Sequence, residues 1–222
     1  MFERVVLLIG NDNLDKIKKT TVLVVGLGGV GGYACEALIR SGVGKIIIID
    51  YDKIDLSNLN RQIITNINNI GESKVNEMKK RILAINSKCE VITEEIFLDK
   101  DNINILDKYN IDYIVDACDS VCTKKLLIDY SIEKDIKLVA SMGTANKVDP
   151  TKLEIIDIRK TSYDPLAKIL RKYVLDIKTN KKIMVVSSTE KPIRKDCLAS
   201  LVFVPATAGI LCANYIIRDI VK

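Results

Sequence analysis

A cluster of five glycines between residues 26 and 32 is the feature of the chain that most clearly indicates chemistry. It follows the apolar run 22–25, and Gly26, Gly28 and Gly31 fit the spacing G-x-G-x-x-G. In a strand–turn–helix unit the first glycine allows the tight turn, the second lets a phosphate approach the backbone, and the third lets helix and strand pack closely. The free N–H groups at the start of the helix then face an anion. The spacing therefore predicts a phosphate-binding turn.

An acidic residue follows this turn at the distance expected for a contact with a ribose. The second apolar run, residues 46–49, ends in Asp50. The tip of the second strand of a βαβ unit is where a carboxylate accepts a hydrogen bond from a ribose hydroxyl. The glycines alone could serve packing, but the turn, the helix and Asp50 together predict a nucleotide site.

Two cations beyond Asp50 favour ATP over a dinucleotide. Arg61 lies three residues after Asn58 in the following loop, and Lys74 comes at the start of the next helical stretch. A pyrophosphate on a helix N-terminus does not require two added cations, whereas attack at the α-phosphorus of a triphosphate builds charge that Arg and Lys stabilise. Arg61 could instead be a solvated loop charge. Lys74 opposes the helix dipole at that position, so a phosphate partner suits it better.

Asp119 is the predicted ligand of a magnesium ion. It follows the segment 112–117 (DYIVDA), which is predicted to be a buried strand, and so lies at the carboxyl end of that strand, where open α/β sheets bind their ligands. One carboxylate at that place suits Mg²⁺ that is held jointly with phosphate oxygens. The sequence leaves open a second role, in which Asp119 caps the helix that begins near Ser120.

The composition excludes several other kinds of site. The 222 residues contain no His, which rules out a His-dependent triad, and the six Cys form no C-x-x-C pair, so no zinc ligand set is present and no zinc is expected. Thiols without such pairs are typical of a reducing, cytoplasmic location. The N-terminal residues show no cleavable signal pattern. Residues 206–221 are apolar but interrupted by charges and too short for a span, so no membrane insertion is expected.

The order of apolar and amphipathic segments predicts the fold class. Strand-like runs alternate with segments of helical period up to about residue 141. This alternation predicts an α/β fold, a Rossmann-like, doubly wound and mostly parallel sheet with helices on both faces. We expect one domain over residues 1–222, with an N-terminal helical arm (1–20, its helix at 7–18), a nucleotide-binding core (21–141, including a short helix at 101–109), and a C-terminal elaboration with a closing helix (142–222).

Four separated motifs in the first 141 residues resemble those of the ubiquitin-activating-like adenylyltransferases, which include the molybdopterin- and thiamine-synthesis activators. The motifs are GLGGVG, IIIIDYDKIDLSNLNRQ, IGESK and DACDS, in this order and spacing. The resemblance implies that the glycine turn, Asp50, Asn58, Arg61, Lys74 and Asp119 bind ATP and Mg²⁺. Arg61, Lys74 and Asp119, with Arg4, are the predicted catalytic residues. The full predicted ATP-binding set is Gly26, Gly28, Gly29, Gly31, Asp50, Asp52, Ser57, Asn58, Arg61, Lys74, Asp119 and Ser120.

The N-terminal arm carries a further implication of the resemblance. Arg4, within Phe2-Glu3-Arg4, matches an arginine that in this family reaches into the ATP site of the partner subunit. The resemblance therefore implies a homodimer. Taken from the residues alone, an Arg on such an arm is more often a solvated charge.

The second half of the chain resembles one branch of that family, the tRNA threonylcarbamoyladenosine dehydratases. SMGTANKVDP, KTSYDPLAKILRK and VVSSTEKP carry this resemblance. It implies ATP-dependent dehydration, a cyclisation, of N6-threonylcarbamoyladenosine in tRNA through an acyl-adenylate, with loss of AMP. A carboxylate is inert until one oxygen becomes a good leaving group, which adenylation achieves, and here the nucleophile is already attached to the substrate.

The charge of the C-terminal third agrees with an RNA partner. Residues 151–195 hold twelve Lys or Arg and five Asp or Glu, a net charge of +7 against +5 for the whole chain. Composition alone would favour a solvated, lysine-rich face, whereas the resemblance favours contacts to tRNA phosphates. The predicted tRNA-binding residues are Arg159, Lys160, Lys168, Arg171 and Lys172.

Departures from the family pattern decide between its branches. The zinc-binding Cys pairs of the molybdopterin- and thiamine-synthesis branches are missing. Cys197 falls loosely where some relatives form a thioester, and Arg194 and Lys195 beside it would favour a thiolate. Cyclisation needs no enzyme thioester, so Cys197 is a weak candidate nucleophile.

Three other functions remain as alternatives. The main one is an adenylyltransferase that activates the C-terminus of a ubiquitin-like sulfur-carrier protein, and a ubiquitin-like or sulfur-relay protein is the corresponding partner. A non-catalytic nucleotide-binding scaffold is disfavoured because Arg61, Lys74 and Asp119 are all present. An NAD oxidoreductase is disfavoured because the chain has no His to handle the alcohol proton, although Tyr or Lys could replace it.

Overall fold

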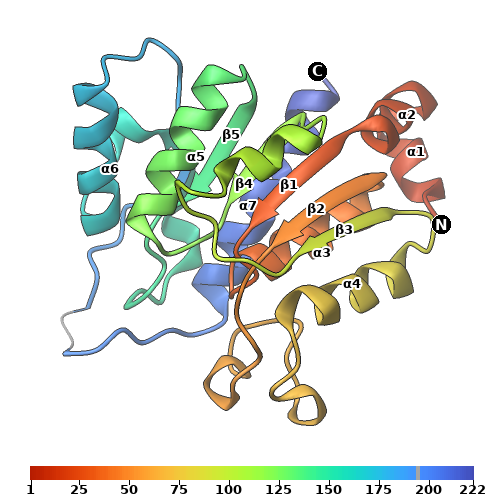
Figure 1. Ribbon diagram of the computed structural model, residues 1–222, viewed down its shortest axis with the longest axis horizontal. Helices are drawn as coiled ribbons and strands as arrows, with labels where there is room; N and C mark the ends of the chain where they lie inside the picture. The colour runs from red at the N-terminus through yellow and green to blue at the C-terminus, as the bar shows by residue number, and fades with distance from the viewer. Residues whose placement is uncertain (194–195) are drawn as a thin grey trace.

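The computed structural model describes residues 1–193 and 196–222, which form a mixed sheet covered by helices on both faces (Figure 1). Its seven strands lie in the order β3-β2-β1-β4-β5-β7-β6. The strands are β1 (Thr21–Val25), β2 (Lys45–Ile49), β3 (Glu90–Glu94), β4 (Tyr113–Asp116), β5 (Lys137–Ser141), β6 (Leu153–Asp157) and β7 (Met184–Ser188). All neighbours pair in parallel except β6, which runs antiparallel to β7 at one edge. The predicted fold class is confirmed.

Seven α-helices accompany the strands in the described part of the chain. They are α1 (Glu3–Ile9), α2 (Asn11–Lys19), α3 (Gly31–Ser41), α4 (Lys74–Ile85), α5 (Val121–Glu133), α6 (Pro165–Asp176) and α7 (Phe203–Ile220). None of the helices described is long and apolar enough to cross a membrane.

Alternating side chains of the central strands create two cores. In β1, Val22 and Val24 belong to a core with residues of α3, α4 and α7, whereas Leu23 and Val25 belong to a core with residues of α5 and α6. All four are buried, as expected for a parallel strand covered on both faces. The apolar run 46–49 in β2 divides in the same way. The central strands therefore have a hydrophobic core on each face of the sheet.

Two local details differ from the sequence prediction. The N-terminal arm forms two helices instead of one, because Gly10 adopts φ +81° between them and its N–H bonds the carbonyl of Val6. The predicted helix at 101–109 is a 3₁₀ helix, Ile103–Lys108. Short 3₁₀ pieces are common as connectors, and a helical period does not distinguish them from a short α-helix.

The order of the strands fixes the location of a ligand site. From β1 the chain builds β2 and β3 on one side and β4 and β5 on the other. Such a reversal leaves a crevice beyond the carboxyl ends of β1 and β4, which is where open α/β sheets bind their ligands. The glycine turn follows β1, Asp50 follows β2, and Asp119 lies three residues beyond β4.

Candidate active site

A cleft of about 1020 Å³ opens at this crevice and gathers most of the predicted ATP-binding residues. Its lining includes the glycine turn, the loop after β2, the start of α4, the end of β4 and the loop after β5. Of the predicted set, the cleft is lined by Gly26, Gly28, Gly29, Asp50, Asp52, Ser57, Asn58, Arg61, Lys74 and Asp119. Two predicted residues, Gly31 and Ser120, do not line it.

The glycine turn brings the N-terminus of α3 to the cleft. Gly26 has φ +88°, and a Cβ on it would lie 2.8 Å from the carbonyl oxygen of Ala117 on the neighbouring strand segment. A Cβ on Gly31 would lie 1.8 Å from the carbonyl oxygen of Gly26, so Gly31 allows the helix to pack on the turn rather than forming the cleft wall. The N-cap residue Val30 has no side chain that accepts the first N–H groups of α3. The N–H of Gly32 bonds the carbonyl of Gly28 at 3.2 Å, so the other N–H groups of the first turn, those of Gly31 and Tyr33, are the donors available to an anion.

Asp50 is a buried carboxylate at the tip of β2. Its Oδ2 accepts the N–H of Leu27 at 2.6 Å and its Oδ1 accepts the N–H of Asp52 at 2.8 Å. Burial raises its pKa above the usual value, although the nearby Lys74 ammonium and the two backbone donors oppose this. The carboxylate is thus held in one orientation by the turn that it faces, with lone pairs left for a hydroxyl.

Lys74 and Arg61 approach the cleft from the segment between β2 and β3. The Lys74 side chain is 5% exposed, and its Nζ lies 2.7 Å from Oδ2 of Asp52, which is 44% exposed. The Arg61 Nη1 donates to the carbonyl of Ser57 at 2.7 Å and to Oδ1 of Asn60 at 2.9 Å. The Asp52 carboxylate therefore orients the Lys74 ammonium, and the loop before Arg61 orients its guanidinium. Arg61 is not a randomly placed surface charge.

Asn58 orders this loop. Its side-chain oxygen accepts the N–H of Asp55 at 3.1 Å, while the Asp55 carboxylate accepts the N–H of Ser57 at 2.8 Å. This reciprocal cap closes the 3₁₀ helix Leu56–Asn58. The side chain of Asn58 is buried within the lining of the cleft.

Asp119 and Ser120 have separate roles at the end of β4. Ser120 is the N-cap of α5, and its Oγ accepts the N–H of Thr123 at 3.3 Å. The capping alternative for Asp119 is therefore wrong, because Ser120 makes the cap. Asp119 is exposed in the cleft, with its carboxylate available to a ligand.

A buried ion pair, which sequence reasoning missed, supports this end of β4. Lys124 Nζ lies 3.0 Å from Oδ1 of Asp116 and donates to the carbonyl of Ser141 at 2.9 Å, with both charged side chains fully buried. It joins β4, α5 and β5 below the cleft. The available signal in the sequence was Lys124, a charged residue on an otherwise apolar face of the predicted helix.

Gln62 also lines the cleft and was not predicted. Its side chain is 6% exposed, and among the described residues its Oε1 has no hydrogen-bond partner. Its position directly after Arg61 in the same motif was the available signal. A buried amide oxygen without a partner at a cleft is typical of a site that a ligand completes.

The C-terminal third forms the opposite wall of the cleft. Lys147 Nζ donates to the carbonyl of Gly143 at 2.6 Å and to Oδ2 of Asp164 at 2.8 Å. Asp164 is the N-cap of α6 and accepts the N–H of Ala167 at 2.9 Å. Neither charged residue was predicted, although Asp164-Pro165 is a typical signal for a helix start.

The segment before α7 crosses this side of the cleft. Asn146, with φ +58°, bonds Ala199 through its backbone N–H and its side-chain oxygen, at 2.7 and 2.8 Å. Asn60 Nδ2 donates to the carbonyl of Ser200 at 2.9 Å. The loops after β2 and β5 are therefore joined through the segment that leads into α7.

Cys197 lies in the same segment but outside the cleft lining. It is exposed, whereas the next two residues, Leu198 and Ala199, contribute to the lining. Arg194 and Lys195, which were expected to act on its thiol, lie outside the described residues.

Arg4 is not brought to the cleft of its own chain. It lies in α1, at the end of the molecule where the strands begin, and the cleft lies at the other end (Figure 1). Phe2 packs beside Gly42, which follows the C-terminal end of α3. Within one chain, Arg4 therefore lies towards the C-terminal end of α3, away from the glycine turn at its N-terminus.

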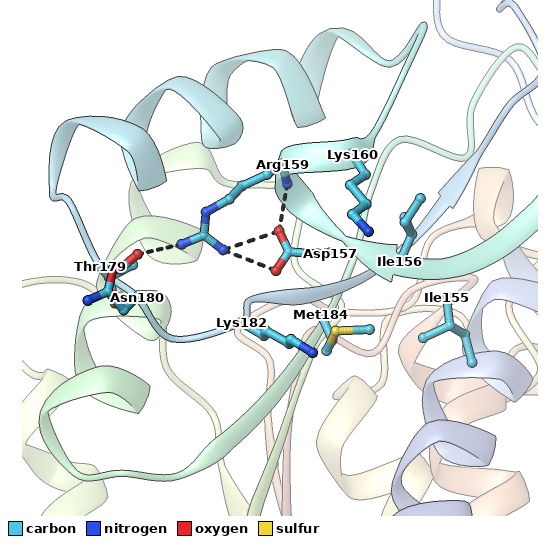
Figure 2. Close-up of a pocket in the computed structure, with 9 residues that line it drawn as sticks. All are labelled: Ile155, Ile156, Asp157, Arg159, Lys160, Thr179, Asn180, Lys182 and Met184. Atoms are coloured by element: carbon cyan, nitrogen blue, oxygen red, sulfur yellow. Dashed lines mark hydrogen bonds and ion pairs between the residues drawn. The ribbon is translucent and has the colours of Figure 1, made fainter.

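The five predicted tRNA-binding residues fall into two groups. Arg159 lines a smaller pocket of about 560 Å³ beside β6 and β7, where its guanidinium binds the Asp157 carboxylate at 3.0 Å and the Thr179 carbonyl at 2.6 Å (Figure 2). Arg171 donates to the carbonyl and hydroxyl oxygens of Thr161. Both guanidinium groups are thus used within the chain. The other three, Lys160, Lys168 and Lys172, are exposed and make no ion pair within the described residues.

The chain is similar to known proteins over nearly its whole length. The sequence matches the ThiF family over residues 2–221. The chain belongs to the ThiF family. The ThiF family fold explains why the glycine turn, Arg61, Lys74 and Asp119 meet at one sheet edge, because their motifs occupy the loops after β1, β2 and β4.

Two relatives and one solved structure each match more than nine-tenths of this chain. The tRNA threonylcarbamoyladenosine dehydratase of Bacillus subtilis is 39% identical, over 100% of this chain and 94% of the relative. The Escherichia coli protein of the same name is 36% identical, over 93% of this chain and 76% of the relative. A crystal structure of the Escherichia coli enzyme TcdA in complex with ATP is 34% identical, with a TM-score of 0.93, over 99% of this chain and 93% of that one.

Proposed function

We propose that this protein catalyses the ATP-dependent dehydration of N6-threonylcarbamoyladenosine in tRNA, through an acyl-adenylate. The observation that carries the proposal is the cleft itself, because it joins an uncapped helix N-terminus, two oriented cations and an exposed carboxylate at the sheet reversal. Similarity over 100% and 93% of this chain to two proteins named as dehydratases of this nucleoside supports the substrate.

ATP is proposed to lie along the cleft from the glycine turn towards Asp50. The free N–H groups of α3 suit its phosphates, and the fixed Asp50 carboxylate suits a ribose hydroxyl. Beyond Asp50, the cleft is lined by Ile96, Phe97 and Leu98, which suit a flat, largely apolar base. Arg61 and Lys74 would then face the triphosphate.

The reaction needs a carboxylate oxygen to attack the α-phosphorus while pyrophosphate leaves. Arg61 and Lys74 would stabilise the charge that develops on the phosphate oxygens, and their loop already holds them in place. The carbamoyl group of the same substrate then attacks the acyl carbon, and AMP leaves as the ring closes. No side chain needs to form a covalent intermediate, in agreement with the position of Cys197 outside the cleft lining.

The residues present fit Mg²⁺ bound to phosphate. No group of three or more acidic, Cys or His side chains in metal-binding arrangement occurs in the described residues, and the exposed Asp119 supplies one carboxylate at the cleft. One or two carboxylates plus substrate phosphates is the usual magnesium environment. When bound, the ion would supply neutralisation of the phosphate charge.

A homodimer is part of the proposal. The helix α1, which carries Arg4, lies at the end of the sheet where the strands begin (Figure 1), whereas the cleft is lined by segments at their carboxyl ends. The exposed Leu7 and Leu8 on the same arm leave an apolar surface for a partner. Arg4 of one chain would then complete the ATP site of the other. The exposed Lys160, Lys168 and Lys172 are proposed to contact tRNA phosphates, and we propose a cytoplasmic location.

The test is AMP release from ATP and Mg²⁺ with tRNA that carries threonylcarbamoyladenosine, followed by mass analysis of the nucleosides. We expect tRNA-dependent AMP and the loss of one water from that nucleoside, and no AMP with tRNA that lacks the threonylcarbamoyl group. ATP–pyrophosphate exchange that requires an added ubiquitin-like or sulfur-relay protein would contradict the proposal. It would instead identify a carrier-activating adenylyltransferase.

A further inference from the structure

The start of α6 and the loop after β5 form one wall of the cleft, and an exposed aromatic residue directly precedes the N-cap of α6. The wall is held by the ion pair between Lys147 and Asp164, whose charged side chains are each 1% exposed. Breaking so deeply buried a pair leaves an uncompensated charge, so the start of α6 is locked to the loop after β5. Tyr163 directly precedes Asp164.

Tyr163 adopts an unfavourable backbone conformation, and its aromatic side chain is exposed to solvent. Its φ is +58°, which is uncommon for a bulky residue. The N–H of Asp164 bonds the carbonyl of Ser162 at 2.7 Å, which tightens the turn. The side chain is nevertheless 58% exposed, so its ring does not contribute to a core. Strain of this kind persists where the surroundings enforce it and is concentrated at ligand sites.

Lys191 places a positive charge on one face of this ring. Its Nζ lies 5.0 Å from the ring centroid of Tyr163. The next residue, Pro192, lines the cleft, as do Asp164 and Pro165 beside Tyr163. The aromatic ring and its ammonium group therefore stand at the rim of the cleft, with part of the ring open to solvent.

The charges around this pair favour an anionic ligand. Lys168 is exposed at the end of the first turn of α6, four residues after the N-cap Asp164. A residue directly before the N-cap, as Tyr163 is, approaches this side of the helix. Glu190, the nearest acidic residue along the chain from Lys191, accepts the N–H groups of Val148 and Asp149. Asp164 is neutralised by Lys147.

We propose that Tyr163 is a stacking platform for an unpaired nucleobase of the RNA substrate, and that Lys191 contacts a phosphate beside that base. The inference rests on the proposed function and assigns to it one base-contacting residue. Unstacked bases of RNA loops bind aromatic side chains through their π-faces, and adjacent cations contact the backbone. A base held at the rim would leave its modified neighbour free to enter the cleft.

The test compares Tyr163→Asn with Tyr163→Phe. Asn tolerates the left-handed backbone and removes the ring, whereas Phe keeps the π-face. We expect Tyr163→Asn to raise KM for tRNA by about 5- to 150-fold, the equivalent of about 1–3 kcal/mol for one stacked base, with KM for ATP unchanged. Tyr163→Phe should stay within about twofold of wild type. Lys191→Met should weaken the salt dependence of tRNA binding.

A binding measurement makes the test independent of turnover. The chain contains no Trp, so Tyr163→Trp introduces a single indole fluorophore whose emission a stacked base quenches. Quenching by tRNA, and not by an equal concentration of ATP, supports the inference. If the wild type shows tRNA-dependent AMP release but Tyr163→Asn keeps its KM for tRNA, the inference is overturned and the proposed function stands. A wild type without tRNA-dependent AMP overturns both.

Discussion

The charged side chains of the cleft are each held in one orientation by a neighbouring group. Asp50 is held by two backbone N–H groups, Lys74 by the Asp52 carboxylate, and Arg61 by the carbonyl of Ser57. Preorganised charges cost no reorganisation when charge develops on a phosphate. In the proposed mechanism, turnover depends on individual oriented groups, and removing one of them should be more harmful to turnover than to stability.

Arg61→Ala and Asp119→Ala are each expected to abolish AMP formation, with a loss of about 100-fold or more, and to leave the thermal unfolding curve unchanged. Both side chains contact solvent in the cleft, so neither supports the core. The measurement is AMP release under saturating ATP, with Lys88→Ala as a control for loss of one exposed cation. Near-wild-type turnover of either variant would contradict the ATP assignment.

Cys197→Ala is expected to retain most of the activity. The thiol is exposed, lies outside the cleft lining, and has no step to perform when the nucleophile belongs to the substrate. AMP release and the mass of the tRNA nucleoside should match those of the wild type. An inactive Cys197→Ala protein with a normal melting temperature would assign a catalytic role to this residue.

Among the elements of the fold, close packing of two helices determines where the N-terminal end of α3 lies at the cleft. Gly209 of α7 lies against the first turn of α3, and a Cβ at this position would lie 2.1 Å from the carbonyl oxygen of Val30 and 2.9 Å from the backbone nitrogen of Ala34. Both neighbours are backbone atoms of α3, which cannot move aside as a side chain can. The last helix of the chain thus supports the first turn of its nucleotide site.

Gly209→Ala is expected to destabilise the fold and weaken ATP binding. Overpacking costs about 1–3 kcal/mol, which for a chain of this size lowers Tm by about 2–4 °C per kcal/mol. Asn214→Ala, at an exposed position of the same helix, is the matched control and should change Tm little. An unchanged Tm and ATP dissociation constant for Gly209→Ala would show that α7 does not constrain α3.

In the proposed homodimer, the ATP site is shared between two chains. Arg4 lies on the arm at the beginning of the strands, and the cleft lies at their carboxyl ends (Figure 1). One chain therefore supplies the glycine turn, Arg61, Lys74 and Asp119, and the partner would supply Arg4. This arrangement predicts complementation between two inactive variants.

Arg4→Ala and Asp119→Ala are each expected to be inactive as homodimers and to recover activity when unfolded and refolded together. In a mixed dimer, the Arg4→Ala chain keeps its own Asp119 and receives Arg4 from its partner. Random pairing makes half of the dimers mixed, with one intact site in each, so about a quarter of the wild-type AMP release is expected. Two separately refolded variants that are mixed afterwards are the control. If a confirmed mixed dimer shows no recovery of AMP release, the shared site is excluded.

Local patterns along the chain are sufficient to predict the strands and the phosphate-binding turn. Alternating apolar runs define the strands, and the glycine spacing with Asp50 defines the turn and its acid, because these features require residue types at fixed distances along the chain. The division into arm, core and elaboration stays a prediction. The absence of His and of paired Cys limits the possible chemistry through composition alone.

Tertiary packing, in contrast, establishes how distant segments complete the cleft. It brings Lys147 onto Asp164, Lys124 onto Asp116, and Gly209 against Val30, although these pairs are far apart in sequence or carry no periodic signal. It also assigns Arg159 and Arg171 to internal contacts and Ser120 to a helix cap. The physical reason is that burial and hydrogen-bond partners depend on which elements pack together, and a side chain's type alone does not specify its partner.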